Sequence, residues 1–200
     1  MNLYTTDQKL LFSSNHKSLK ETIEAAINDN TSLDHLDVKD QDLRNINMDG
    51  ALMRYARFQN TDLTGANMSE ALLDGSNFSY AHMYNACVAY SSLQYVDFME
   101  TEFGATDLSQ SNINDSIFSG PSCHSLTFRH VRTMKGSKYL YQKKLYDMQR
   151  PPTLIRCEAG DIVIFDDHIL KEGQMIKKDN AQKSPITPIE ECLISGHTRV

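Results

Sequence analysis

An apolar residue stands at every fifth position of this chain from Leu33 to Phe128, in one unbroken register. A helix repeats its buried face about every 3.6 residues and a half-buried strand every 2, so neither keeps these side chains on one buried surface. A period of five requires a chain that turns a corner once per pentad and points one large side chain inward each time. Such internal repetition predicts a solenoid. The twenty central positions are Leu33, Val38, Leu43, Met48, Met53, Phe58, Leu63, Met68, Leu73, Phe78, Met83, Val88, Leu93, Phe98, Phe103, Leu108, Ile113, Phe118, Cys123 and Phe128.

The other positions of each pentad also repeat. A small side chain stands two residues before most centres, as Ala51, Ala66 and Ser76 do. Asp or Asn often stands directly before the centre, as at Asp62 and Asn67. The small group also faces the coil interior, where there is little room, and the Asp or Asn side chain can hydrogen-bond nearby backbone at the corner.

Three stretches show the complete unit: TDLTG (61–65), ANMSE (66–70) and SNFSY (76–80). They resemble the repeats of the pentapeptide-repeat family. The resemblance implies a right-handed quadrilateral β-helix with four pentads per coil, so the twenty centres would form about five coils. It also implies a kind of partner, because some family members look like duplex DNA in size, shape and charge and bind DNA gyrase.

We predict a mainly β chain in three parts: an N-terminal cap (1–30), the β-helix (31–130) and a small mixed α/β C-terminal appendix (131–200). In the cap, SLKE (Ser18 to Glu21) has the spacing of a capping box, and Leu19, Ile23 and Ile27 stripe one helix face. A helix from Leu19 to about Asn28 would cover the strand edges of the first coil, which are otherwise a template for aggregation.

In the appendix, Leu154–Cys157 and Asp161–Phe165 are candidate strands joined by a turn at residues 158–160. TPIE (Thr187 to Glu190) is a second capping box, and Gly196 stands where the C-terminal cap of that helix would fall. Basic residues and tyrosines alternate between residues 131 and 150, a mixture that can contact nucleic acid. Docking on the acidic coils, or simple solvation, is the more economical interpretation of these charges.

The sequence lacks the patterns typical of catalysis and cofactor binding. It contains no Gly-rich phosphate loop, no nucleophile elbow and no HExxH. A turn after a buried strand explains the run Asp166–His168 better than a metal does, and a ligand cluster of His124, His130 and Cys123 is equally disfavoured. The four cysteines include no CxxC pair, which indicates reduced thiols. We expect no enzymatic activity, no catalytic residue, no metal and no cofactor.

The sequence also bears on location. It contains no apolar run long enough to span a bilayer and no charged-then-apolar signal peptide at its start. We therefore expect a cytoplasmic protein without a membrane partner. A compact inhibitor of this size would suit a phage or mobile-element product.

Charge is distributed unevenly along the chain. The whole chain carries −6, whereas residues 33–130 hold five basic and thirteen acidic residues, a difference of −8. An acidic rod does not bind nucleic acid through its coils, but it can imitate nucleic acid. Five coils at a strand spacing of about 4.8 Å give a length of about 24 Å, or about seven base pairs. Two features depart from the gyrase-binding members: no insertion interrupts the register, and the appendix is not a short dimerising helix.

Four candidate partner-binding residues are acidic, and they fall on three consecutive faces of one coil: Asp97, Glu100, Glu102 and Asp107. Four more form an apolar wall: Leu52, Tyr55, Leu72 and Tyr95. With four pentads per coil, the two leucines stack at an outward position where Asp or Asn is usual. Because such a wall is unusual for a solvated solenoid, we expect it to be covered by the appendix, by a second copy in a homodimer, or by the target. Cover by the appendix is the simplest case, since residues 131–200 must pack on something.

These observations predict a non-enzymatic, protein-binding solenoid. Its acidic coils would act as a DNA mimic that antagonises a DNA-binding protein, such as a topoisomerase or a host defence factor. Two alternatives stay open. In one, the solenoid is a structural scaffold that displays a C-terminal interaction module. In the other, the protein is an enzyme with a site in residues 131–200.

Overall fold

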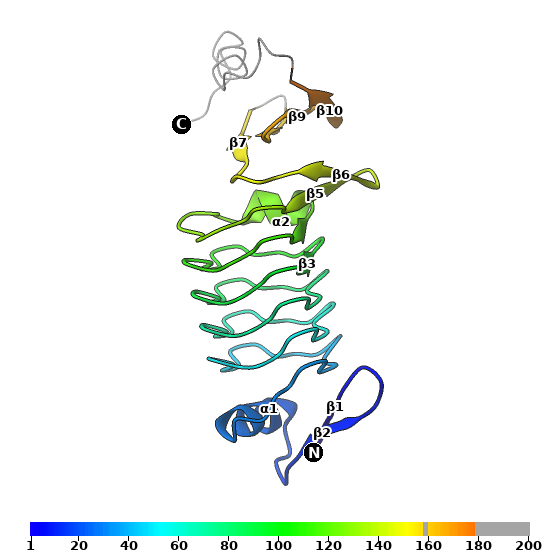
Figure 1. Cartoon of the computed structure of the whole chain (residues 1–200), viewed down its shortest axis with the longest axis vertical. Coiled ribbons are helices and arrows are strands. Elements are labelled where there is room, and N and C mark those ends of the chain that lie inside the picture. The colour runs from blue at the N-terminus through cyan, green and yellow to red at the C-terminus, as the bar shows by residue number, and fades with distance from the viewer. Residues whose placement is uncertain (158–159, 179–200) are drawn as a thin grey trace.

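The computed structural model describes residues 1–157 and 160–178, and these form an elongated rod (Figure 1). A hairpin and a helix lie at the N-terminal end, the coils form the middle, and small sheets lie at the other end. No helix within the described part of the chain is long and apolar enough to cross a membrane. The second capping box, Gly196 and Cys192 lie outside the described residues.

The N-terminal cap consists of a hairpin and a helix. β1 (Asn2–Tyr4) pairs antiparallel with β2 (Leu10–Ser13), and α1 spans Leu19–Asn28, the bounds that the sequence indicates. The Glu21 N–H donates to Ser18 Oγ (3.1 Å), and the Ser18 N–H donates to the Glu21 carboxylate (3.4 Å). This reciprocal pair is a capping box, and it fixes the start of the helix.

Side chains of α1 replace the backbone partners that a preceding coil would supply. Lys20 Nζ donates to the Arg44 carbonyl (3.0 Å), and the Glu24 carboxylate accepts from the Asn47 N–H (2.9 Å). Ile23 is fully buried in the core that the helix shares with the coils. The exposed edge of the first coil is therefore partly satisfied by the helix packed against it.

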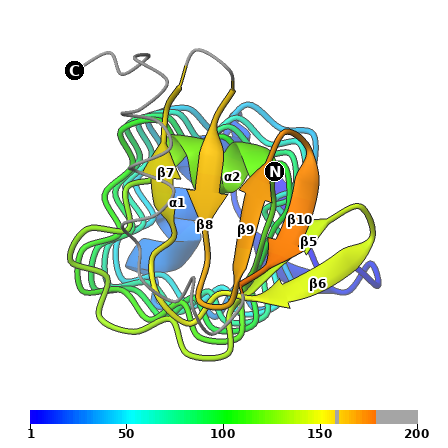
Figure 2. The same cartoon turned by 90° about the horizontal axis from the view of Figure 1, so that it is seen from above.

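The middle of the chain is a β-helix whose parallel bridges join residues twenty apart. The bridges fall into four columns, as the pairs Asp37↔Arg57, Asp42↔Asp62, Asn47↔Asn67 and Leu52↔Leu72 illustrate. In one column the pairing is regular enough to form the short strands β3 (Asp97–Phe98) and β4 (Ile117–Phe118). A corner every five residues and a repeat of twenty give each coil four sides, and the coils superimpose when viewed along the rod (Figure 2).

Each corner is a tight turn. The Ala56 N–H donates to the carbonyl of the central residue Met53 (3.3 Å), and Tyr55 between them has a φ of 59°. A positive φ at the third residue is the property of a type II turn, where Gly or Asn is usual. Corner residues with positive φ recur along the rod, and four of them are exposed tyrosines: Tyr55, Tyr80, Tyr90 and Tyr95.

The predicted central residues are confirmed from Leu33 to Phe118, since every one of them is almost completely buried. Phe58, Phe78 and Phe98 stack along one side, with ring centroids 4.7 and 5.7 Å apart. The small hydroxyl residues beside them are buried too, and most of them donate to the carbonyl of a centre in the preceding coil. Examples are Thr61 to Val38 (2.8 Å) and Ser116 to Leu93 (2.7 Å). These bonds satisfy polar groups that the narrow core encloses.

The Asp and Asn residues before the centres act at the corners as the sequence predicts. The Asn77 side-chain oxygen accepts from the Ser79 N–H (2.9 Å), and the Asp62 carboxylate accepts from the Thr64 N–H (3.0 Å). Both bonds span two residues, which is the local pattern that favours Asp and Asn in turns.

The register changes after Phe118, which corrects the prediction of an unbroken repeat to Phe128. The short helix α2 (Gly120–Ser125) replaces one side of the coil, and the bridge that follows joins Asn112 to Thr133, 21 residues on. One extra residue has therefore entered the coil.

Cys123 and Phe128 are buried as predicted, but Cys123 lies in α2 and neither keeps the twenty-residue stacking. Met134 and Tyr139 are the buried residues that follow the bridged positions of the last coil. Coil pairing continues into β5 (Lys138–Tyr141), which is parallel to β4, so the coils extend past residue 130, where the sequence analysis ends them.

The C-terminal part stacks on the end of the rod. β6 (Lys144–Asp147) pairs with β5 as a hairpin, and β7 (Thr153–Ile155), β8 (Ile162–Ile164), β9 (His168–Lys171) and β10 (Gln174–Lys177) form an antiparallel sheet. Phe165 packs on Tyr139 of the last coil, with ring centroids 4.5 Å apart. β7 and β8 overlap the two predicted strands, whereas β9 and β10 were not predicted.

Candidate protein-binding surface

One side of the coils carries a group of exposed apolar side chains, which we call the leucine–tyrosine wall. It comprises Leu52, Tyr55, Leu72, Tyr90 and Tyr95, whose exposed fractions are 37, 55, 37, 67 and 66%. Four of the five are the residues that the sequence predicts for this face. Tyr90 lies on the same face, because Tyr90 and Tyr95 stand at the two corners of one segment, and that segment lies one coil beyond Leu72.

The wall rests on backbone that is hydrogen-bonded from coil to coil. The Leu72 N–H donates to the Ala51 carbonyl, and the Met53 N–H donates to the Leu72 carbonyl, both at 2.9 Å. Tyr55 is held between His35, whose ring lies 5.1 Å away, and Gly75. A Cβ at position 75 would approach Tyr55 Cδ1 to 2.5 Å, so the ring rests directly on the glycine. A rigid, preformed surface of this kind loses little conformational entropy when it binds.

The appendix does not cover this wall, within the residues that the structure describes. The sheet β10-β9-β8-β7 lies at the end of the rod (Figures 1 and 2), and Leu52 and Leu72 stay exposed. The expectation that residues 131–200 would cover the wall is therefore wrong for residues 131–157 and 160–178. The appendix instead buries its apolar face on the last coil, through contacts such as Tyr139 with Phe165.

The edges of the wall are polar: Arg54, next to Tyr55, pairs with Asp34 (2.9 Å), and acidic side chains stand further along the rod. Glu70 is exposed at the same corner column as Tyr90. Asp74 accepts hydrogen bonds from Ser92 Oγ (2.6 Å) and from the Gln94 N–H (2.8 Å), which holds its carboxylate beside Leu72. An apolar centre with a charged rim is the usual composition of a protein–protein interface.

The four acidic candidates are held separately, each by neighbours of its own. Asp97 is half-buried and accepts from the Met99 N–H (2.9 Å), and burial raises the pKa of its carboxyl group. Ser119 Oγ donates to Glu100 (2.9 Å). A hydrogen bond from Tyr84 lowers the pKa of Glu102, which also contacts His82 Nδ1 (3.2 Å). Of the four, only Asp107 is exposed, and hydrogen bonds from Ser109 lower its pKa.

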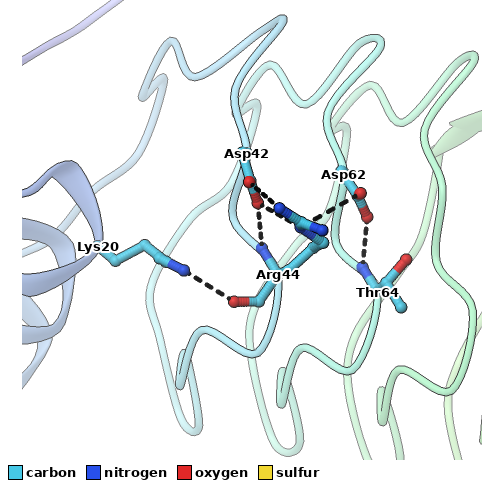
Figure 3. Close-up of polar contacts among 5 residues, drawn as sticks. All are labelled: Lys20, Asp42, Arg44, Asp62 and Thr64. Atoms are coloured by element: carbon cyan, nitrogen blue, oxygen red, sulfur yellow. Dashed lines mark hydrogen bonds and ion pairs between the residues drawn. The ribbon is translucent and has the colours of Figure 1, made fainter.

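Arginines neutralise several carboxylates near the N-terminal end of the coils. Arg44 forms ion pairs with Asp42 (2.6 Å) and Asp62 (3.6 Å), which lie on successive coils (Figure 3). The hydrogen bonds from Arg44 hold the pKa of Asp42 well below its usual range. Arg54 and Arg57 pair in the same way with Asp34 (2.9 Å) and Asp37 (3.3 Å).

The rest of the coil region has little such compensation beyond the Arg44–Asp62 pair and the contact of His82 with Glu102. Residues 58–128 contain eight acidic side chains and neither Lys nor Arg. The negative charge that the sequence assigns to the coils is therefore concentrated in their C-terminal two thirds, beside Leu72, Tyr90 and Tyr95. A charge count over the whole coil region misses this division. The sequence does contain the signal, because four of the five arginines and lysines of the coil region precede residue 58.

The other polar clusters that the sequence singles out have structural partners. Asp166 pairs with Arg150 (2.6 Å), and His168 Nδ1 lies 2.8 Å from Asp167. Cys123 is buried against Met148 Sδ (3.7 Å), and burial raises the pKa of its thiol. Among the described residues, no three His, Cys, Asp or Glu side chains are placed to hold a metal ion together.

Comparisons with known proteins agree with the repeat. A sequence model described as pentapeptide repeats matches residues 31–69 and 56–89, with eight copies. Similar solved structures include a pentapeptide repeat protein from the Arabidopsis thaliana thylakoid lumen, with 26% identity over 42% of this chain and 66% of that chain (TM-score 0.28). No curated protein matches the sequence.

Two further similar structures are bacterial or plasmid-borne. Rfr23 of the cyanobacterium Cyanothece 51142 is 18% identical over 51% of this chain and 65% of that chain (TM-score 0.39). QnrB1, a plasmid-mediated fluoroquinolone resistance protein, is 20% identical over 52% of this chain and 60% of that chain (TM-score 0.31). The chain therefore spans between 60 and 66% of the length of these three proteins.

Proposed function

We propose that this chain, whose residues 31–89 match pentapeptide repeats, is a non-enzymatic protein that binds another protein through the leucine–tyrosine wall. The observation that carries the proposal is the exposure of Leu52 and Leu72 at positions where neighbouring columns carry Asp or Asn. Burying these leucines and the three tyrosines beside them supplies the apolar area on which binding depends.

Charge defines the chemistry of the partner. Glu70 and Asp74 border the wall, and residues 58–128 contain no Lys or Arg. The complementary surface is an apolar patch with a basic rim. A second copy of the chain would bring two acidic surfaces together, so like-charge repulsion disfavours a homodimer through this wall.

A basic surface of this kind is typical of DNA-binding proteins, which form the first partner class that we propose. The coils would then act as an acidic mimic of duplex DNA and antagonise a topoisomerase or a host defence factor. The acidic stretch 58–128 supports the proposal that the partner is a DNA-binding protein. The ion pairs of Arg44, Arg54 and Arg57 confine the mimicry to the C-terminal part of the coils, because they neutralise carboxylates elsewhere.

A structural scaffold is the second candidate function. The sheet β10-β9-β8-β7 lies at the exposed end of the rod (Figure 1), and Ile176 on its edge strand is 44% exposed. An edge strand with an exposed apolar residue can pair with another chain. In that case the coils would position this sheet, and the wall would play no part in binding.

Capture of partners by variants of the full chain separates the two candidates. Immobilised wild-type protein, Leu72→Glu, Tyr80→Glu and Ile176→Glu are exposed to the same cell extract, and the proteins retained by each are compared. Tyr80 is the matched control, since it is an exposed aromatic residue at a different corner column. Circular dichroism melting confirms that each variant is folded.

The proposal expects a partner that the wild type, Tyr80→Glu and Ile176→Glu retain and that Leu72→Glu loses. A partner lost only with Ile176→Glu would favour the scaffold function. Retention of every partner by Leu72→Glu would refute binding through the wall. Sedimentation of the purified chain reports any self-association, which should be absent.

A further inference from the structure

A groove separates the last coil from the C-terminal sheet, on a part of the molecule that the proposed function does not use. Its volume is about 550 Å³, within the range of small-molecule sites. One wall is formed by α2 and the segment after it, and the other by β7 and the residues around it. The lining residues are Cys123, His124, Ser125, Leu126, Thr127, Phe128, Arg129, Pro151, Pro152, Leu154 and Arg156.

The lining divides into an apolar floor and a basic rim. Leu126 and Phe128 are buried in the floor, and Leu154 faces them half-buried from β7. Arg129 and Arg156 are exposed at the rim, from opposite walls of the groove. Of the described residues that line the groove, none is acidic.

These two arginines differ from Arg150 and Lys138 of the same region. Arg150 pairs with Asp166 and Lys138 pairs with Asp147, so their charges are compensated. Within residues 1–157 and 160–178, neither Arg129 nor Arg156 forms an ion pair. Two uncompensated guanidinium groups at one groove favour an anion, since each can donate two parallel hydrogen bonds to a carboxylate or phosphate.

We propose that this groove binds a small organic anion that has a phosphate or carboxylate head and an apolar body. The head lies between Arg129 and Arg156, and the body lies on Leu126, Phe128 and Leu154. The apolar floor distinguishes this ligand from an inorganic anion, which would gain nothing from it. The uncompensated rim distinguishes it from a neutral apolar ligand, which would leave the arginines unpaired.

Isothermal titration of the full chain with four probes tests the proposal. 1-Naphthyl phosphate and 1-naphthoate carry both parts of the ligand, inorganic phosphate carries only the head, and 1-naphthalenemethanol carries only an apolar body with a neutral head. We expect at least one naphthyl anion to bind at least tenfold more tightly than both partial probes. The anion that binds more tightly identifies the head group.

Variants locate the binding. Arg129→Gln with Arg156→Gln should weaken the naphthyl anion at least tenfold. The control is Arg132→Gln with Lys135→Gln. Both residues are exposed and lie outside the groove, and the two substitutions remove the same amount of charge as the groove pair. Leu154→Asp adds a carboxylate to the groove and should abolish binding while the melting temperature stays close to the wild type.

Three results would overturn the inference. The first is no binding of either naphthyl anion at millimolar concentration. The second is equal affinity for the neutral probe, which would show an apolar site only. The third is an equal loss in the control pair, which would show non-specific attraction to a basic surface.

Discussion

At the scale of the residue, each position of the pentad has one physical role. The central side chain fills the coil, the small residue two places earlier is buried beside it, and the Asp or Asn before the centre bonds the turn. The corner residue takes a positive φ and points outward, which explains why large side chains such as Tyr80 and Tyr90 are tolerated there. Leu52 and Leu72 break this pattern, since they replace a turn-bonding residue by an exposed apolar one.

The difference between centre and corner predicts the cost of two substitutions. Phe78 is fully buried and stacked between Phe58 and Phe98, so Phe78→Ala should lower the free energy of unfolding by about 3–5 kcal/mol. Tyr80 is 59% exposed, and Tyr80→Ala should change it by less than about 0.5 kcal/mol. Chemical denaturation measures both, and equal costs would contradict the assignment of inside and outside.

Residue roles in the coils could largely be predicted from the sequence, because a five-residue period leaves one way to bury every centre. The leucine–tyrosine wall followed from the same register. The surroundings of Asp97, Glu100 and Glu102 could not be predicted, because their bonds to Asn77, Ser119 and Tyr84 join side chains from neighbouring coils. Such contacts depend on rotamers that the repeat does not determine.

At the scale of the element, the ends of the solenoid are formed by different means. At the N-terminal end, α1 supplies side chains to backbone groups of the first coil. At the other end, α2 adds one residue to the coil, and β5 then carries the pairing into a hairpin and a sheet. The sequence conceals the change at α2, because Cys123 and Phe128 are apolar, buried and correctly spaced although the register has moved.

The hairpin and the last two strands were also difficult to predict. Gln142 and Lys143 form the β5–β6 turn with positive φ at both residues, a conformation for which Asn and Gly are the usual signals. From the sequence alone, the segment that forms this hairpin is recognisable only as a basic stretch. Tertiary contact with the last coil, through Tyr139, stabilises strands that the local sequence does not signal.

The capping box of α1 provides a test at this scale. Ser18→Ala removes the acceptor of the Glu21 N–H and should lower the free energy of unfolding by about 1 kcal/mol. Ser18→Asp keeps an acceptor at the same position and should stay close to the wild type. If Ser18→Ala and Ser18→Asp melt at the same temperature, the cap does not stabilise the fold.

At the scale of the whole molecule, charge is divided along the rod. Arginine pairs compensate the first coils, and residues 58–128 are acidic and contain no Lys or Arg. The groove arginines Arg129 and Arg156, which form no ion pair with any residue that the structure describes, follow at the C-terminal end. This division gives the wall and the groove opposite electrostatic surroundings. It therefore assigns a basic partner to the first and an acidic ligand to the second.

The acidic stretch predicts how partner binding responds to salt. If its carboxylates contribute, affinity should fall steeply between 50 and 300 mM salt, on the order of tenfold or more. The combined substitutions Glu70→Gln and Asp74→Asn, which remove the two carboxylates bordering the wall, should weaken binding and reduce the salt dependence without altering the fold. Affinity indifferent to both salt and these changes would exclude electrostatic mimicry and leave the apolar contact alone.

The central claim, that the leucine–tyrosine wall is the binding surface, is tested most directly by hydroxyl-radical footprinting of the captured complex. Tyr84 is an internal reference, since it is 39% exposed and belongs to the side of the coil opposite the wall. The account predicts that partner binding slows the oxidation of Tyr55, Tyr90 and Tyr95 and leaves the rate at Tyr84 unchanged. Protection of Tyr84 with unchanged rates at the three wall tyrosines would contradict it.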